Sequence, residues 1–227
     1  MFQHKDPSYV GHDFEELLEY LQPLQLFQIP VNSFFDSSDS IRILSYMFVN
    51  NPQLLMLNFS KGSLDTMLEI ILTSSKNISF GLILNCILSV SFKHSFLELY
   101  RLIERIFPVN YIQDFHGKSG TTMKFLDFSA LLESSTGWKP KEYEAVERIF
   151  DNTKLKTKKF FEDFLDSSAE LRVQKDHVCF YRLRNSIVHF RANHEEYNLD
   201  ENQWNLLLIA TLYILDEQYS MYQKILV

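Results

Sequence analysis

Residues 180–191, FYRLRNSIVHFR, form the stretch that decides the fold class of this 227-residue chain. Phe180, Leu183, Ile187 and Phe190 recur at the spacing of one helical face, and neither glycine nor proline interrupts the stretch. The pattern therefore predicts an amphipathic helix with its polar residues on the opposite side.

The polar side of this predicted helix carries Arg184 and His189, five positions apart. Cleavage of RNA without a metal needs a group that titrates near pH 7 to move a proton, and a fixed cation to neutralise charge on the phosphoryl oxygens. Histidine and arginine have these two properties. On an ideal helix, the two side chains are about 140° apart around the axis and separated by about 7.5 Å of rise. Arg182 lies on the same side as His189, so it is an alternative cation.

One copy of the motif therefore does not easily place both groups on one phosphate, unless the arginine wraps around or the helix end frays. Two copies of the chain, packed with their motif helices facing each other, would bring two histidines and two arginines into one cleft. Such a pair of copies would place the site at the interface between them.

The segment RNSIVH matches the R-x4-H pattern of the HEPN superfamily, in which a polar residue follows the arginine. Residues 96–107, FLELYRLIERIF, resemble the opening helix of HEPN proteins from bacterial defence loci such as the ApeA-like group. The resemblance covers residues 92–227. It implies an all-α, HEPN-like helical bundle that dimerises around an RNase site needing neither metal nor cofactor. The catalytic residues implied are Arg184 and His189, with Asn185 in support.

HEPN toxins that are paired with nucleotidyltransferase antitoxins often carry a tyrosine two places after the histidine, where this chain has Arg191. This difference argues against regulation by nucleotide transfer onto such a tyrosine. The resemblance still implies a toxin–antitoxin or antiphage role, with an antitoxin or another defence-system protein as a partner.

Basic residues gather around the motif, although the whole chain has a net charge of −7. Residues 154–191 hold nine basic and five acidic residues, a local charge of +4. A cationic strip of this kind would attract phosphates electrostatically. The predicted RNA-binding residues are Arg182, Arg191, Tyr181 and Lys175, with the tyrosine able to stack on a base.

Three other interpretations of the same residues remain open. Arginine and histidine on the polar side of a helix are often simply solvated. The domain could instead be a non-catalytic helical module that binds RNA or a partner protein, or a structural subunit of a larger assembly.

Glu104 could orient an arginine in the site, but a surface contact with Tyr100 or Arg101 is the simpler expectation. His94, His116 and His177 are expected to be surface or capping residues.

The sequence predicts a HEPN-like domain over residues 91–227 and a mostly helical accessory region of unassigned role over residues 1–90. The chain has only 6 glycines and 6 prolines, and this low content favours long helices with few tight turns. Helices are expected at residues 13–22, Ser63–Leu72, 92–106 and 122–133. Two more are expected further on, one opened by Pro140 and one whose Phe160, Phe161, Phe164 and Leu165 face inward. A central, largely buried helix is expected at Trp204–Leu215, after a cap at Asn198–Glu201.

Composition and motifs argue against several other classes of protein. Cys86 and Cys179 have no C-x-x-C partners, so neither a disulfide framework nor a zinc site is expected, and a reducing cytoplasm is the predicted location. The longest apolar tract, residues 78–92, is shorter than the about 20 residues that span a bilayer. Residues 116–119, HGKS, lack the earlier glycine of a phosphate-binding loop and are expected to form an ordinary loop.

Overall fold

The computed structural model describes residues 13–18, 20, 35, 39–75, 77–189 and 197–226, and all regular structure within these ranges is helical. The predicted all-α fold class is therefore confirmed. The chain divides into two compact units, residues 1–37 and residues 38–227. Within the first unit, the described helix is α1 (Phe14–Leu18), the central part of the helix predicted over residues 13–22.

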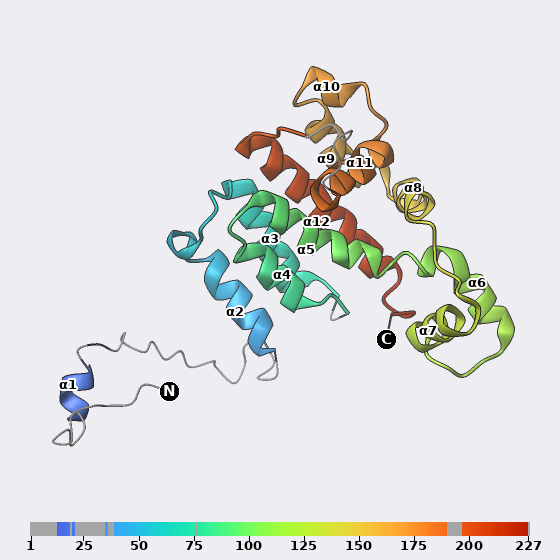
Figure 1. The fold of residues 1–227 in the computed structure, drawn as a ribbon, viewed down its shortest axis with the longest axis horizontal. Helices are drawn as coiled ribbons and strands as arrows, with labels where there is room; N and C mark the ends of the chain where they lie inside the picture. Colours follow the sequence, from blue (N-terminus) through green and yellow to red (C-terminus); the bar gives the residue numbers. More distant parts are fainter. Residues whose placement is uncertain are drawn as a thin grey trace. The chain divides into compact units, whose positions relative to one another are not determined.

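The second unit contains the remaining described helices, which Figure 1 labels along the chain. They are α2 (Ser40–Val49), the short 3-10 helix η1 (Pro52–Leu54), α3 (Lys61–Thr73), α4 (Phe80–Ile87), α5 (Phe92–Glu104), α6 (Val109–Ser119), α7 (Phe125–Thr136), α8 (Glu142–Asn152), α9 (Leu155–Leu165), α10 (Ala169–Arg172), α11 (Asp176–Val188) and α12 (Glu201–Met221).

Helix α12 forms the centre of this unit and packs against α3, α5 and α9 (Figure 1). Its apolar residues are distributed around the whole helix, as expected for a helix covered on several sides. Trp204, Leu208 and Leu215 are buried, which confirms the predicted central helix. The segment is also fixed at its start, where Asp200 accepts the backbone N–H of Gln203 and the Gln203 side chain accepts the backbone N–H of Asp200.

Helices on both sides of the predicted boundary at residue 90 pack into the same core. Helix α4 packs on α5, α3 packs on α12, and α2 packs on both α3 and α4. Helix α5 begins after Ser91, whose hydroxyl accepts the backbone N–H of His94, and its predicted apolar face is buried through Phe96, Leu99 and Ile103. A separate role for residues 1–90 stays a prediction.

Several predicted helix boundaries were wrong by a few residues. The helix expected from Ser63 begins after Ser60, whose hydroxyl caps it, and the predicted cap of α12 at Asn198 is replaced by Asp200. Pro140 precedes the N-cap residue Lys141 and is not the first helical residue of α8. The helix predicted over residues 122–133 begins and ends three residues later, as α7 (Phe125–Thr136). Short polar residues are abundant near these starts, so local sequence does not single out the one that caps.

Two further expectations need correction. The segment at residues 116–119 is the end of α6 and not a loop, with Gly120 adopting the left-handed conformation (φ 67°) that ends the helix. On α9, Phe161 and Phe164 are buried as predicted, but Phe160 and Leu165 are only half-buried. The Phe160 ring nevertheless stacks on that of Tyr213 from α12, with the ring centres 4.1 Å apart.

Candidate functional site

Helix α11 carries the motif, and its apolar residues fix how it lies. Phe180 and Leu183 are buried, and α11 packs against α8, α5 and α9. The ring of Phe180 meets that of Phe96 edge-on at 5.3 Å and stacks against that of Tyr100 at the same distance. Ile187 is half-buried, and Phe190 lies outside the described residues. The predicted apolar face is thus confirmed where it is described, and it turns Arg184 toward α5 and α8.

Arg184 makes ion pairs with carboxylates from two other helices. Its Nη2 donates to Oε1 of Glu104 on α5 at 3.0 Å, and its Nε lies 3.2 Å from Oε1 of Glu142 on α8. Its Nη1 donates to Oδ1 of the neighbouring Asn185 at 3.0 Å. The guanidinium carbon also lies 5.4 Å from the centre of the Tyr100 ring. Arg184 is therefore held on all of its nitrogens by a defined set of partners.

Tyr100 on α5 also contacts this group of side chains. Its hydroxyl donates to Oε1 of Glu142 at 2.9 Å, the same oxygen that faces Arg184. Burial raises the pKa of Tyr100, and the negative charge of Glu142 raises it further. The hydroxyl therefore stays protonated and serves as a permanent donor that orients the Glu142 carboxylate. We call Tyr100, Glu104, Glu142, Arg184 and Asn185 the arginine cluster.

The cluster is only partly withdrawn from water. The side chain of Arg184 is 17% exposed, and those of Glu104 and Glu142 are 37% and 28% exposed. Ion pairs in such positions are weakened by solvent and salt, but removal of one partner still leaves a poorly solvated charge. The Arg184 side chain therefore keeps a small exposed surface.

His189 lies at the end of α11 and not within it. The helix ends at Val188, and His189 follows in an extended conformation (φ −111°, ψ 98°) while its backbone N–H donates to the Asn185 carbonyl at 2.9 Å. The prediction that Arg184 and His189 lie on the same helix was thus wrong for the histidine. Its imidazole is exposed and makes no hydrogen bond or ion pair with any residue that the structure describes.

The predicted RNA-binding residues have different surroundings. Arg182 and Lys175 are exposed on α11 and at its N-cap. Tyr181 is half-buried and forms a T-shaped contact with the ring of Tyr143, with the ring centres 5.4 Å apart, so its ring is already partly covered. Arg191 lies outside the described residues.

Sequence reasoning missed part of this arrangement. Glu104 was weighed as an orienting group but was expected at the surface, whereas it pairs with Arg184. Glu142 was not predicted at all, because a glutamate in the first turn of a helix is ordinary. The expectation that His177 is a surface or capping residue was wrong. It is buried, with its Nε2 3.3 Å from the Tyr143 hydroxyl and 3.6 Å from Glu147.

In the part of the chain that the structure describes, no group of three or more histidine, cysteine, aspartate or glutamate side chains is placed to hold a metal ion. None of the helices there has the length and apolar character to cross a membrane.

The fold and the site together define an all-helical protein with an exposed histidine one turn beyond an arginine that two carboxylates hold. Comparison with known proteins adds no family to this description, since no family model, curated protein or solved structure matches the chain.

Proposed function

We propose that this protein is a metal-independent endoribonuclease of the HEPN type that cleaves single-stranded RNA, such as tRNA or mRNA, as a homodimer. The observation that carries the proposal is the contrast between the two motif residues at the end of α11. Arg184 is held rigidly by neighbouring side chains, whereas His189 is exposed and uncommitted among the described residues. A fixed cation and a free imidazole are the two groups that phosphodiester cleavage requires.

In the proposed reaction, the His189 imidazole takes the proton of the RNA 2′-hydroxyl. The 2′-oxygen then bonds to phosphorus and the bond from phosphorus to the 5′-oxygen breaks. The products are a 2′,3′-cyclic phosphate and a 5′-hydroxyl, whose proton comes from water, and the protonated imidazole then releases its proton to solvent. Arg184 stabilises the charge on the phosphoryl oxygens, and Asn185 holds the guanidinium or a phosphate oxygen in place.

The proposed biological setting rests on the resemblance of the R-x4-H segment. An RNase of this type is toxic to its own cell, so we propose a cytoplasmic role in toxin–antitoxin or antiphage defence. An antitoxin or another protein of the defence system would restrain it.

The test is incubation of the purified chain with total cellular RNA in EDTA, followed by sequencing of the new RNA ends. Wild-type protein should produce fragments ending in cyclic phosphate. His189→Ala should produce none and keep its fold, because the side chain is exposed. His94→Ala is the matched control, since His94 is exposed on α5, and it should cleave like wild type. Cleavage that persists in His189→Ala, or that requires a divalent metal, would reject the mechanism.

A non-catalytic module that binds RNA or a partner protein is the second candidate, and one observation favours it. Glu104 and Glu142 together outweigh the single positive charge of Arg184, so the arginine cluster has a formal charge of −1. Such a cluster attracts phosphate less than a free guanidinium does. Salt-sensitive RNA binding without new RNA ends would support this second function.

A further inference from the structure

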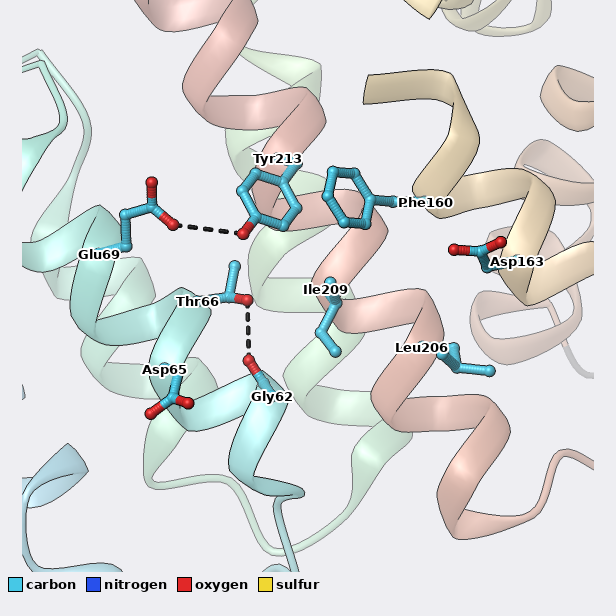
Figure 2. A pocket seen from close by; sticks show the side chains of 9 residues that line it. All are labelled: Gly62, Asp65, Thr66, Glu69, Phe160, Asp163, Leu206, Ile209 and Tyr213. Atoms are coloured by element: carbon cyan, nitrogen blue, oxygen red, sulfur yellow. Dashed lines mark hydrogen bonds between the residues drawn. The ribbon is translucent and has the colours of Figure 1, made fainter. Parts of the chain in front are cut away.

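A pocket of about 340 Å³ lies on the second unit, away from the motif, where α3, α9 and α12 meet (Figure 2). Small-molecule sites typically enclose about 300–1,000 Å³, so this pocket has room for one small ligand. All nine residues that line it belong to the described part of the chain, and three of them are acidic while none is basic.

The floor of the pocket is apolar. Phe160 from α9 and Tyr213 from α12 stack with their ring centres 4.1 Å apart and their planes 16° apart. Leu206 and Ile209 extend the floor along α12 (Figure 2). All four side chains are only half-buried, so they offer an apolar surface that a ligand could still cover.

Carboxylates stand on two opposite sides of this floor. Asp65 and Glu69 come from α3 on one side, and Asp163 comes from α9 on the other (Figure 2). The three side chains are exposed, and none forms an ion pair with a cation among the residues that the structure describes. The pocket therefore presents negative charge, then apolar surface, then negative charge again.

The α3 side of the pocket is also held in place. The Tyr213 hydroxyl donates to Oε2 of Glu69 at 3.2 Å, and burial raises the pKa of this tyrosine, so the hydroxyl keeps its proton and its donor role. Gly62 opens the same side. A Cβ atom added there would lie 3.3 Å from Cδ1 of Ile209, which is tighter than most packed contacts, so Ile209 would have to shift slightly.

We propose that this pocket binds a linear aliphatic diamine or polyamine, with an ammonium group at each acidic side and the methylene chain on the floor. A single metal cation would leave the apolar floor uncovered, and a purely apolar ligand would leave the three carboxylates without a cationic partner. A chain with separated positive charges satisfies both parts of the lining. The assignment is independent of RNA cleavage, because no residue of the arginine cluster lines the pocket.

The experiment is titration of the full chain, without RNA, with spermidine and 1,5-diaminopentane, followed by calorimetry and by amide NMR shifts at Gly62 and Ile209. Both amines should bind, pentylamine should bind more weakly, and 1,5-pentanediol should not bind. The double variant Asp65→Asn, Glu69→Gln should raise Kd about tenfold or more, as should Asp163→Asn. Glu162→Gln, which removes the same charge from α9 outside the pocket, should bind like wild type.

The proposal is overturned if wild-type protein binds neither amine, or if Glu162→Gln weakens binding as much as Asp163→Asn, since that would be nonspecific attraction. Binding of a lysine-containing peptide in place of the free amines would overturn it in favour of a protein partner. Gly62→Ala provides a variant without any change of charge. Its added methyl group narrows the pocket, and it should weaken amine binding while the helical circular dichroism is unchanged.

Discussion

At the scale of single residues, the arginine cluster shows how one side chain can serve both stability and chemistry. Arg184 connects α5, α8 and α11 through Glu104, Glu142 and its neighbour Asn185. Without it, two carboxylates and a buried tyrosine hydroxyl would face one another with no compensating cation. The same guanidinium is the cation of the proposed nuclease site, so the two roles must be separated by experiment.

Replacement of Arg184 by alanine should therefore destabilise the fold. We expect the free energy of unfolding to fall by about 2 kcal/mol, because the pair is partly buried and the carboxylates lose their partner. Urea denaturation followed by circular dichroism measures this change. Arg101→Ala is the matched control, since Arg101 pairs with Glu98 at the surface with 58% of its side chain exposed, and it should change stability by less than about 1 kcal/mol. Equal losses in both variants would contradict a structural role for the cluster.

The two cysteines give a prediction for alkaline pH. Burial raises the pKa of both Cys86 and Cys179 to about 12, from 9.0. The thiols should therefore not react with a disulfide reagent at pH 8 in the folded protein, and both should react after denaturation. Because the unfolded chain loses these protons first, the free energy of unfolding should fall as pH rises from about 9 toward 12. Rapid reaction of either thiol in the native protein at pH 8 would contradict the burial.

At the scale of elements, helix ends decide where the polar groups of the molecule lie. Helix α11 places Arg184 inside the cluster, and the end of the helix at Val188 leaves His189 in an extended conformation. An ideal helix continued through His189 would put the two side chains on different sides of one cylinder. Because the helix ends before His189, the histidine is not subject to that restriction. This agrees with the alternative in which the helix end frays.

The cap of α12 provides a test at the same scale. Asp200→Ala removes the side chain that accepts the Gln203 N–H, so the free energy of unfolding should fall by about 1 kcal/mol. Asn198→Ala changes the residue that sequence alone suggested as the cap, and it should have little effect because Asn198 is exposed. Urea midpoints of the two variants compare them directly. A larger loss in Asn198→Ala would show that α12 begins two residues earlier.

At the scale of the whole molecule, the proposed active site requires two copies of the chain. If the histidine of one copy acts with the arginine of the other, two inactive variants should restore activity when mixed. Mixing the His189→Ala protein with the Arg184→Lys protein would form heterodimers. Each heterodimer would hold one intact site and one doubly altered site. Cleavage should recover to about a quarter of the wild-type rate, since random pairing makes half of the dimers mixed and each has one of two sites.

Sedimentation provides the accompanying measurement, with an expected mass of about twice the 26.9 kDa of one chain. Recovery of cleavage together with a dimer supports a shared site. If the wild-type protein is an active dimer but the mixed variants stay inactive, both residues of each site must come from the same copy. A monomer that still cleaves RNA would reject the dimer and leave the chemistry to one chain.

The sequence by itself determined the all-α class and the apolar faces of several helices, although it did not predict α6 or α10 and placed residues 116–119 in a loop. The spacing in residues 180–191 and the apolar run at Trp204–Leu215 identified α11 and the central helix α12, because helical periodicity is a local property of three to four residues. Only the tertiary structure decided which groups meet Arg184. Glu104 lies 80 residues away in the chain, and its approach depends on how buried rings such as Phe180 pack α5 against α11.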